Sequence, residues 1–270
     1  MSTTPWRGGR VSPRAHCVLA PNPSPMTLDG TNTWVLHEPG AATALVVDPG
    51  PDDEAHLRAV LDVVAGLGAR VAGTLLTHGH PDHSDGARRF ADLTDAPVRA
   101  LDPRHRLGEL GLDEGDVVRA DGFELQVVAT PGHTADSLSF VVPADSALLT
   151  GDTVLGRGTT VVAHPEGRLD DYLRSLHRLA ALADAGTVRT VLPGHGPTLD
   201  DATAVIEQYL THRQARLEQV RQAVAAGAAT APAVVQRVYA DVDRSLWPAA
   251  ELSVRAQLAY LGVTERGAPD

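Results

Sequence analysis

The sequence predicts an α/β protein, a four-layer αβ/βα sandwich with a small helical domain at its C-terminus. The first 200 residues contain two blocks in which short apolar or alternating segments, typical of strands, accompany amphipathic helical patterns. Two such units pack with strands inside and helices outside, because each sheet must bury its apolar face. After residue 200 only helical patterns remain. We therefore predict an N-terminal extension at 1–25, a main domain at 26–200 and a helical domain at 201–270.

In the first block, proline and glycine residues separate the elements. The helix expected at 53–67 has apolar residues at helical spacing and ends before Gly68. The block's expected elements are, in order, strands at 33–37 and 43–47, the helix at 53–67, a strand at 70–76, a helix at 86–93, a strand at 97–101 and a helical turn at 104–111.

The second block begins near Asp116 and repeats the pattern. Its expected elements are strands at 117–119, 123–129, 138–142 and 147–150, an amphipathic helix at 170–185 and a last strand at 187–192. In the helical domain, helices are expected at 202–226, 232–240 and 246–261. Their spacing resembles a winged-helix element, although no clear pair of wing strands follows.

Composition restricts the class of protein. The formal net charge of −11 argues against non-specific nucleic-acid binding, which needs a basic surface. Cys17 is the only cysteine, so the chain has neither an intramolecular disulfide nor a cysteine-rich metal site. No apolar run approaches the ~18 residues of a membrane span, and the N-terminus lacks the apolar region of a signal peptide. We expect a cytoplasmic protein with no membrane contact.

Residues 77–83, with the sequence THGHPDH, carry the strongest chemical signal. Three imidazoles (His78, His80, His83) and the carboxylate of Asp82 lie within seven positions, directly after an apolar strand. Each neutral imidazole has an acceptor nitrogen that needs a partner, and a divalent metal can satisfy several at once. Imidazole and carboxylate are ligands that suit zinc or iron. The run therefore predicts a metal-dependent enzyme, most simply a hydrolase.

Similar signals follow other predicted strands. His133 and His195 each come after a Pro-Gly pair, Asp152 comes after Gly151, and Asp48 ends an early strand. One such residue is an ordinary turn residue. Together with the run at 77–83 they supply five histidines and two aspartates besides Asp48, all expected at strand ends facing one edge of the fold.

This pattern resembles the metallo-β-lactamase superfamily. The resemblance implies a first metal held by His78, His80 and His133, a second held by Asp82, His83 and His195, and Asp152 as the bridge between them. It also implies two Zn²⁺ per chain, with Fe or Mn as alternatives, at the ~3.5–4 Å separation of two-metal sites. A hydroxide shared by the metals would be the nucleophile, with Asp82 orienting it and carrying a proton. We expect Asp48 to orient one of the ligand histidines.

Longer stretches resemble one group within the superfamily, the β-lactamase-like protein 2 group. They are residues 26–34, 151–162 and 169–172, together with His212-Arg213 and residues 234–243 in a winged-helix-like C-terminal domain. That group includes a single-stranded-RNA endoribonuclease in animals and fungal thioesterases that release polyketides from carrier proteins. Asp152 stands where common zinc β-lactamases have a cysteine, so antibiotic hydrolysis is not expected. Ser137 lies close to the position at which animal members of the group have a histidine. This difference argues against direct transfer of the ribonuclease activity.

We therefore predict a dinuclear zinc-dependent hydrolase that cleaves an ester, thioester or phosphodiester bond in a small molecule or a carrier-bound thioester. The alternatives are an endoribonuclease on single-stranded RNA, a mononuclear iron persulfide dioxygenase, and a nucleic-acid-binding module with structural metals. Asn32, Gly158 and Thr159 are expected at the substrate rim. The helical domain is either a lid over the pocket or a surface for nucleic acid or a carrier protein, the latter through arginines at 213, 216 and 221. The chain could be a monomer or a homodimer.

Overall fold

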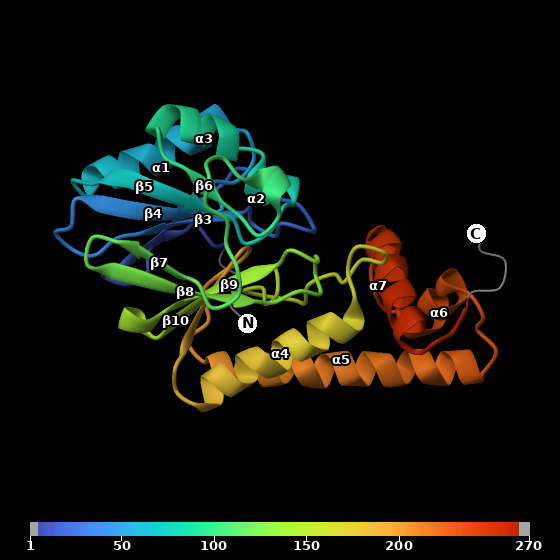
Figure 1. Ribbon diagram of the computed structural model, residues 1–270. Coiled ribbons are helices and arrows are strands. Elements are labelled where there is room, and N and C mark those ends of the chain that lie inside the picture. The colour runs from blue at the N-terminus through green and yellow to red at the C-terminus, as the bar shows by residue number, and fades with distance from the viewer. Residues whose placement is uncertain (1–4, 265–270) are drawn as a thin grey trace.

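A computed structural model describes residues 5–264 of the chain. Two β-sheets lie face to face, with helices on the outer face of each and a cluster of helices at one end (Figure 1). The first sheet has the order β1-β2-β3-β4-β5-β6 and the second β11-β10-β9-β8-β7. The predicted four-layer αβ/βα sandwich is confirmed.

The first sheet is antiparallel from β1 to β4 and parallel from β4 to β6. Its strands are β1 (Gly9–Arg10), β2 (Ala15–Leu19), β3 (Asn32–Leu36), β4 (Thr43–Val47), β5 (Arg70–Leu75) and β6 (Val98–Arg99). Helix α1 (Glu54–Gly66) makes the crossover that a parallel β4–β5 pair requires. Because β1 and β2 belong to this sheet, the segment expected to be a separate extension contributes an edge of the sandwich.

The second sheet is an antiparallel meander to which one parallel strand is added. Its strands are β7 (Val117–Ala120), β8 (Phe123–Ala129), β9 (Leu138–Val142), β10 (Ala147–Gly151) and β11 (Thr190–Pro193). The crossover from β10 to β11 passes through helix α4 (Leu169–Asp184), and β11 pairs parallel to β10.

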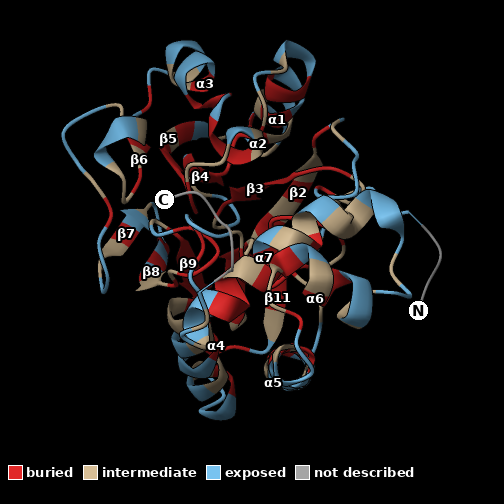
Figure 2. Ribbon diagram, turned by 90° about the vertical axis from the view of Figure 1, so that its right-hand side faces the viewer, coloured by how far each residue is buried: buried red, intermediate tan, exposed pale blue. Residues whose placement is uncertain are grey.

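The main core lies between the two sheets. Trp34 and Leu36 of the first sheet meet Leu125 and Phe140 of the second, and all four side chains are buried. Helices α1 and α3 (Ala87–Thr94) cover the outer face of the first sheet, and α4 covers that of the second. Figure 2 shows the buried residues concentrated on the strands and on the inward faces of these helices.

One predicted strand is much shorter than expected. The strand at 97–101 is only β6, and of the turn at 104–111 only a 3₁₀ segment at Pro103–His105 forms. The Arg106 guanidinium donates hydrogen bonds to the carbonyl oxygens of Ala100 and Leu101. A side chain thus occupies acceptors that a longer strand would offer to a neighbour.

The C-terminal domain consists of helices α5 (Ala202–Ala225), α6 (Ala231–Val238) and α7 (Trp247–Tyr260). Helix α5 packs along α4 and continues past the end of the sandwich, where α6 and α7 pack on it (Figure 1). Val220, Val234 and Val254 belong to the apolar cluster of this domain. From residue 202 to residue 264 no β-strand forms, so the domain has no wing within that range. None of the helices in the described part of the chain is long and apolar enough to cross a membrane.

Candidate metal centre

Loops from both sheets meet at the carboxyl ends of their strands. The Leu138 amide of the second sheet donates to the Thr77 carbonyl oxygen after β5, at 2.7 Å. The Gly194 amide donates to Gly151 O, and the Asn32 amide donates to Gly194 O, each at 2.8 Å. These backbone contacts fix the loops that carry the predicted site residues.

The run after β5 turns sharply and begins a short helix, α2 (Pro81–Ser84). Proline suits the first position of a helix, where its missing N–H costs no hydrogen bond. A Cβ at Gly79 would lie 2.4 Å from His105 Nε2, so a larger residue there would make the His105 ring turn away. His105 therefore lies directly beside the run.

A first group of ligand atoms contains His78, His80 and His133. His80 Nδ1 lies 3.0 Å from His78 Nε2 and 3.0 Å from His133 Nε2. His133 comes from the turn after β8, so this group joins the two sheets. All three atoms could contact a single metal ion.

A second group contains Asp82, His83 and His195. His195 Nε2 lies 3.3 Å from His83 Nε2 and 3.2 Å from Asp82 Oδ2. Asp152 lies between the two groups, with Oδ1 3.4 Å from His83 Nε2 and Oδ2 3.6 Å from His133 Nε2. The structure thus brings all seven predicted metal ligands together.

The other nitrogen of each ring shows which atoms are free to bind a cation. His83 Nδ1 lies 2.8 Å from Asp48 Oδ2, His133 Nδ1 2.8 Å from Val161 O, and His195 Nδ1 3.2 Å from Gly30 O. These oxygens can only accept, so each Nδ1 donates and each Nε2 faces the centre. Burial opposes protonation of His83 and His195, but Asp152 outweighs it and raises both pKa values, that of His195 to about 9. These two rings therefore give up a proton when a metal binds.

Nitrogen and carboxylate oxygen atoms at such distances are held together by a proton or a metal cation between them. Asp152 Oδ1 is also buried without a hydrogen-bond partner among residues 5–264, although buried acceptors are nearly always satisfied. The donor set of imidazoles and carboxylates fits divalent cations such as zinc.

The carboxylates of the centre are ionised. Burial opposes ionisation of Asp152, but His195 and His83 outweigh it and hold its pKa well below the ordinary value. Burial opposes ionisation of Asp82 too, yet His83 and His195 hold its pKa at about 2. Burial lowers the pKa of His78 and of His133, which keeps these rings in the neutral form that binds metals.

Asp48 is buried and accepts three hydrogen bonds. The Thr77 amide and hydroxyl donate to it at 2.8 and 2.7 Å, and His83 Nδ1 donates at 2.8 Å. Thr77 Oγ1 also lies 3.0 Å from His78 Nδ1, so one carboxylate aligns a histidine from each group, directly or through Thr77. Thr77 was not singled out from the sequence, because a threonine at a strand end carries no chemical signal of its own.

The expectation that Asn32 contacts substrate is wrong. Its side chain is fully buried and donates to the carbonyl oxygens of Pro193 and Gly196, at 2.9 and 2.8 Å. Its own oxygen accepts from Trp6 Nε1. Asn32 therefore supports the loop that carries His195.

Close packing explains a glycine next to this histidine. A Cβ at Gly194 would lie 2.6 Å from Asp152 Oδ1 and 2.8 Å from His83 Cε1. The Pro-Gly-His sequence is thus a requirement of space at the centre as well as a turn.

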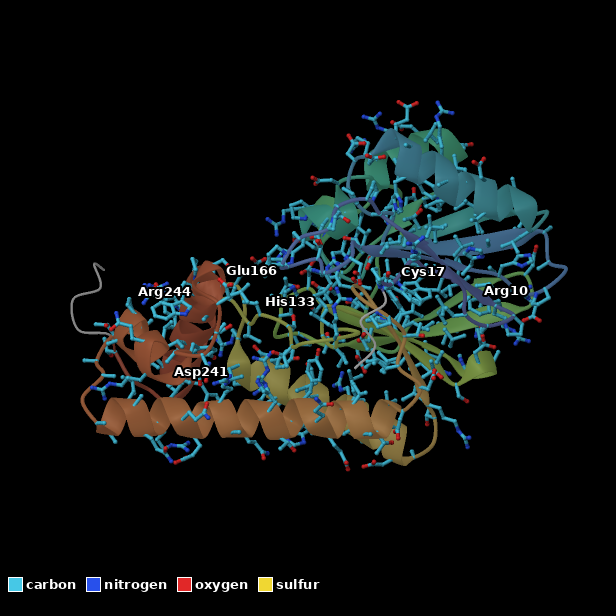
Figure 3. The ribbon with its side chains drawn as sticks, turned by 180° about the vertical axis from the view of Figure 1, so that it is seen from behind. Arg10, Cys17, His133, Glu166, Asp241 and Arg244 are labelled. Atoms are coloured by element: carbon cyan, nitrogen blue, oxygen red, sulfur yellow. The ribbon has the colours of Figure 1, made fainter. Side chains whose placement is uncertain are left out.

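A cavity of about 330 Å³ opens from the centre towards the C-terminal domain. His133 and Asp152 line it from the sandwich, and the segment 155–161, which includes Gly158 and Thr159, forms another side. In Figure 3, His133 lies between the sandwich and the C-terminal helices. The helical domain therefore forms part of the pocket, as a lid would.

Three side chains of the helices hold the segment 153–160 in place. The Tyr172 hydroxyl donates to Thr153 O at 2.6 Å, and the Tyr209 hydroxyl accepts from the Leu155 amide at 2.8 Å. Arg213 donates to Thr160 O and stacks on the Tyr172 ring, 4.9 Å from its centroid. Arg213 is buried, so it cannot be the exposed contact residue that the helix sequence suggested.

Comparison with known proteins agrees with this architecture. Residues 26–195 match the metallo-beta-lactamase superfamily, and residues 230–262 match the beta-lactamase associated winged helix domain. A beta-lactamase-like protein 2 homolog from Caenorhabditis elegans is 32% identical, over 95% of this chain and 88% of its own length. An atrochrysone carboxyl ACP thioesterase from Aspergillus fumigatus is 32% identical, over 88% of this chain and 79% of its own.

Solved structures extend the likeness over nearly the whole chain. A metallo-beta-lactamase family protein from Thermus thermophilus superimposes with a TM-score of 0.78 and 26% identity, covering 96% of this chain and 97% of that one. The resemblance read from the motifs is thereby confirmed, including the winged-helix match in the C-terminal domain. The chain belongs to the metallo-β-lactamase superfamily, as a metal-dependent hydrolase with a β-lactamase-associated winged helix domain.

Proposed function

We propose that this protein is a dinuclear zinc hydrolase that cleaves thioesters or esters, with a carrier-bound or small-molecule acyl thioester as its substrate. One observation carries the proposal: the Nε2 atoms of His83, His133 and His195 face the centre while their Nδ1 atoms already donate elsewhere. Such an arrangement is preorganised for cations.

Two ions are favoured over one because the second group is as complete as the first. Asp82, His83 and His195 present three ligand atoms, and His83 and His195 are fully oriented by hydrogen bonds. A mononuclear iron dioxygenase would leave part of this buried polar cluster without a partner, which is costly.

Three features favour a thioester or ester over a phosphodiester in RNA. One relative that is 32% identical is described as an acyl carrier protein thioesterase. The cavity has apolar walls at Leu28, Leu155 and Leu246, which suit an acyl group. Ser137 is buried and its hydroxyl bonds Thr134, so it offers no group to an RNA strand.

The residues of the chain then have distinct roles. Two bound divalent cations would lower the pKa of a shared water and polarise the substrate carbonyl. Asp82 is 26% exposed in its side chain, so part of the carboxylate faces the open side of the centre. With a pKa of about 2 it holds a proton only briefly. We therefore assign it the orientation of the attacking water and rapid relay of a proton to the leaving thiolate.

The test is a substrate panel on zinc-loaded protein: acyl thioesters, lactones, a chromogenic phosphodiester and single-stranded RNA. We expect thioester hydrolysis, and a loss of about 10²–10⁴-fold in kcat for Asp82→Asn, the usual contribution of a proton-transferring group. Asp85→Asn is the matched control, because Asp85 is exposed and follows directly after the same short helix as its C-cap.

Elemental analysis of the purified protein should find two zinc ions per chain. RNA cleavage that disappears in Asp82→Asn, without thioester hydrolysis in the parent protein, would identify the endoribonuclease instead. A single iron with oxygen uptake would identify the dioxygenase.

A further inference from the structure

The wall that the helical domain contributes to the cavity is positively charged, although the protein carries a net charge of −11. Arg157, Arg213 and Arg216 all line the cavity, and Asp152 is the only carboxylate among its lining residues. Arg157 is neutralised by an ion pair with Asp29. Neither Arg213 nor Arg216 has a carboxylate within 4.0 Å in the described part of the chain. The cavity therefore has two uncompensated cations opposite the metal centre.

Arg216 is held in place but keeps hydrogen-bonding capacity. Its guanidinium stacks on Tyr239, 4.6 Å from the ring centroid, and Nη1 donates to Gln219 Oε1 and Val238 O, both at 2.9 Å. These contacts use one of its three nitrogens, so Nε and Nη2 keep N–H groups for a ligand. A guanidinium with a fixed plane suits carboxylates and phosphates, which it can bind in a bidentate way.

His212, on the same helix, adds a second polar group to this wall. Its Nδ1 is buried without a hydrogen-bond partner among residues 5–264, as is Nε of Arg213. Burial lowers the pKa of His212, and the nearby charges of Arg213 and Arg216 lower it further. Unpaired polar atoms in a positive field are the surroundings that an anionic ligand would satisfy.

A second hollow adjoins the cavity at Arg216. His212, Arg216 and Val242 line both the cavity at the metal centre and a second, more open hollow of about 730 Å³ along α5 and α6.

We propose that Arg216, assisted by His212, binds an anionic group of the substrate, a carboxylate or a phosphate, while the scissile bond lies at His133 and Asp152. This inference rests on the proposed thioester hydrolysis. It makes Arg216 a determinant of specificity: the substrate is an acyl thioester with a negative charge either on its acyl part or on its leaving thiol.

Two pairs of substrates separate these sources of charge. Succinyl-pantetheine and butyryl-pantetheine differ by a carboxylate on the acyl group. Butyryl-4′-phosphopantetheine and butyryl-pantetheine differ by a phosphate on the leaving thiol. We expect at least one charged member to be preferred about ten- to hundredfold in kcat/KM, mainly through KM, as for a hydrogen bond to a charged group.

The preference should disappear in Arg216→Gln and survive in Arg216→Lys, which keeps the charge. It should be unchanged in Arg221→Gln, because Arg221 is on the same helix, exposed and paired with Glu218. Circular dichroism and thermal unfolding check that Arg216→Gln is folded. A preference that remains in folded Arg216→Gln, or no preference in the parent protein, would overturn the proposal.

Binding of uncleavable thioether analogues of the same compounds to zinc-loaded protein gives a readout that does not depend on turnover. If no thioester is hydrolysed but the charged thioethers still bind more tightly through Arg216, the proposed reaction is wrong and the anion site stands. If thioesters are hydrolysed without regard to charge, the reaction stands and the anion site is wrong. Binding of a short single-stranded RNA through Arg216, with no binding of either charged thioether, would assign the wall to RNA.

Discussion

The metal centre and the helical wall of the cavity face each other, yet they are built in different ways. The centre is formed by side chains at strand ends, and backbone contacts between loops of the two sheets hold it, such as Leu138 N to Thr77 O. The wall is formed by helices that share an apolar cluster with α4 and the second sheet, and Tyr209 and Arg213 bind them to the segment 153–160.

This difference separates the chemistry of the protein from its selectivity. Strand ends in a sandwich core are rigid, because ladder hydrogen bonds and buried apolar side chains fix them. A wall attached by side chains can be altered without moving the strands. We therefore expect substitutions in the metal centre to reduce metal binding and the rate of catalysis. Substitutions where the helices hold the segment 153–160 should change substrate affinity and the stability of the protein.

The largest effect is expected for Asp152→Asn. Asp152 lies 3.3–3.6 Å from Nε2 of His83, His133 and His195, so an amide there removes a negative charge shared by both metal groups. We expect loss of at least one metal ion and a fall in kcat/KM of at least about a hundredfold, the scale for removing an electrostatic contact at a reaction centre. Elemental analysis and thioester hydrolysis measure the two effects.

Asp92→Asn, on the exposed surface of α3, is the control and should behave as the parent protein. Full metal content together with an unchanged rate in Asp152→Asn would show that this carboxylate does not join the two groups.

A smaller effect is expected for Asp48→Asn, which changes the support of the centre and leaves its ligands in place. Asp48 accepts three hydrogen bonds, and an amide can accept fewer. Its backbone has φ +52°, a conformation that asparagine tolerates, so the fold should be kept. We expect zinc affinity to fall about 10–100-fold, measured by competition with a chromophoric chelator.

Asp95 provides a close control, since it also has φ +52° but lies at the exposed end of α3. Asp95→Asn should leave the zinc affinity unchanged. If Asp48→Asn bound zinc as tightly as the parent protein, Asp48 would be a turn residue only.

The same contrast decides what could be predicted from the sequence. The metal centre could be predicted, because imidazoles and carboxylates directly after apolar strands are costly to bury unless they bind a ligand. The strand ends of a sandwich also share one edge, so these residues were expected to meet. The helices and most strands could also be predicted, since α1, α4 and α5 differ from their expected bounds by about one residue.

The residues that support the metal ligands, and the helical wall of the cavity, could not be predicted in this way. Thr77 and Asn32 act through hydrogen bonds that exist only once the loops have met, and a sequence pattern does not show which way a buried amide points. Arginines on one helix look alike in sequence, but the register of α5 against α4 buries Arg213 and leaves Arg221 exposed. Strands β1 and β2 lie in a segment rich in proline and arginine, where alternation is too short to stand out.

The most specific test of the comparison is Arg213→Met, which keeps the length of the side chain and removes its charge. The substitution deletes a buried hydrogen bond from a charged group to Thr160 O and the stacking on Tyr172. We expect the free energy of unfolding to fall by about 1.5–3 kcal/mol and KM for thioesters to rise, because α5 is less firmly attached to the segment 153–160. Arg221→Met on the exposed face of the same helix should change neither quantity.

Zinc affinity should fall less in Arg213→Met than in Asp48→Asn, although Thr160 precedes Val161, whose carbonyl oxygen accepts from His133 Nδ1. A larger loss of zinc than of substrate affinity in Arg213→Met would mean that this arginine supports the metal centre first, and the division between a rigid centre and an attached wall would have to be abandoned.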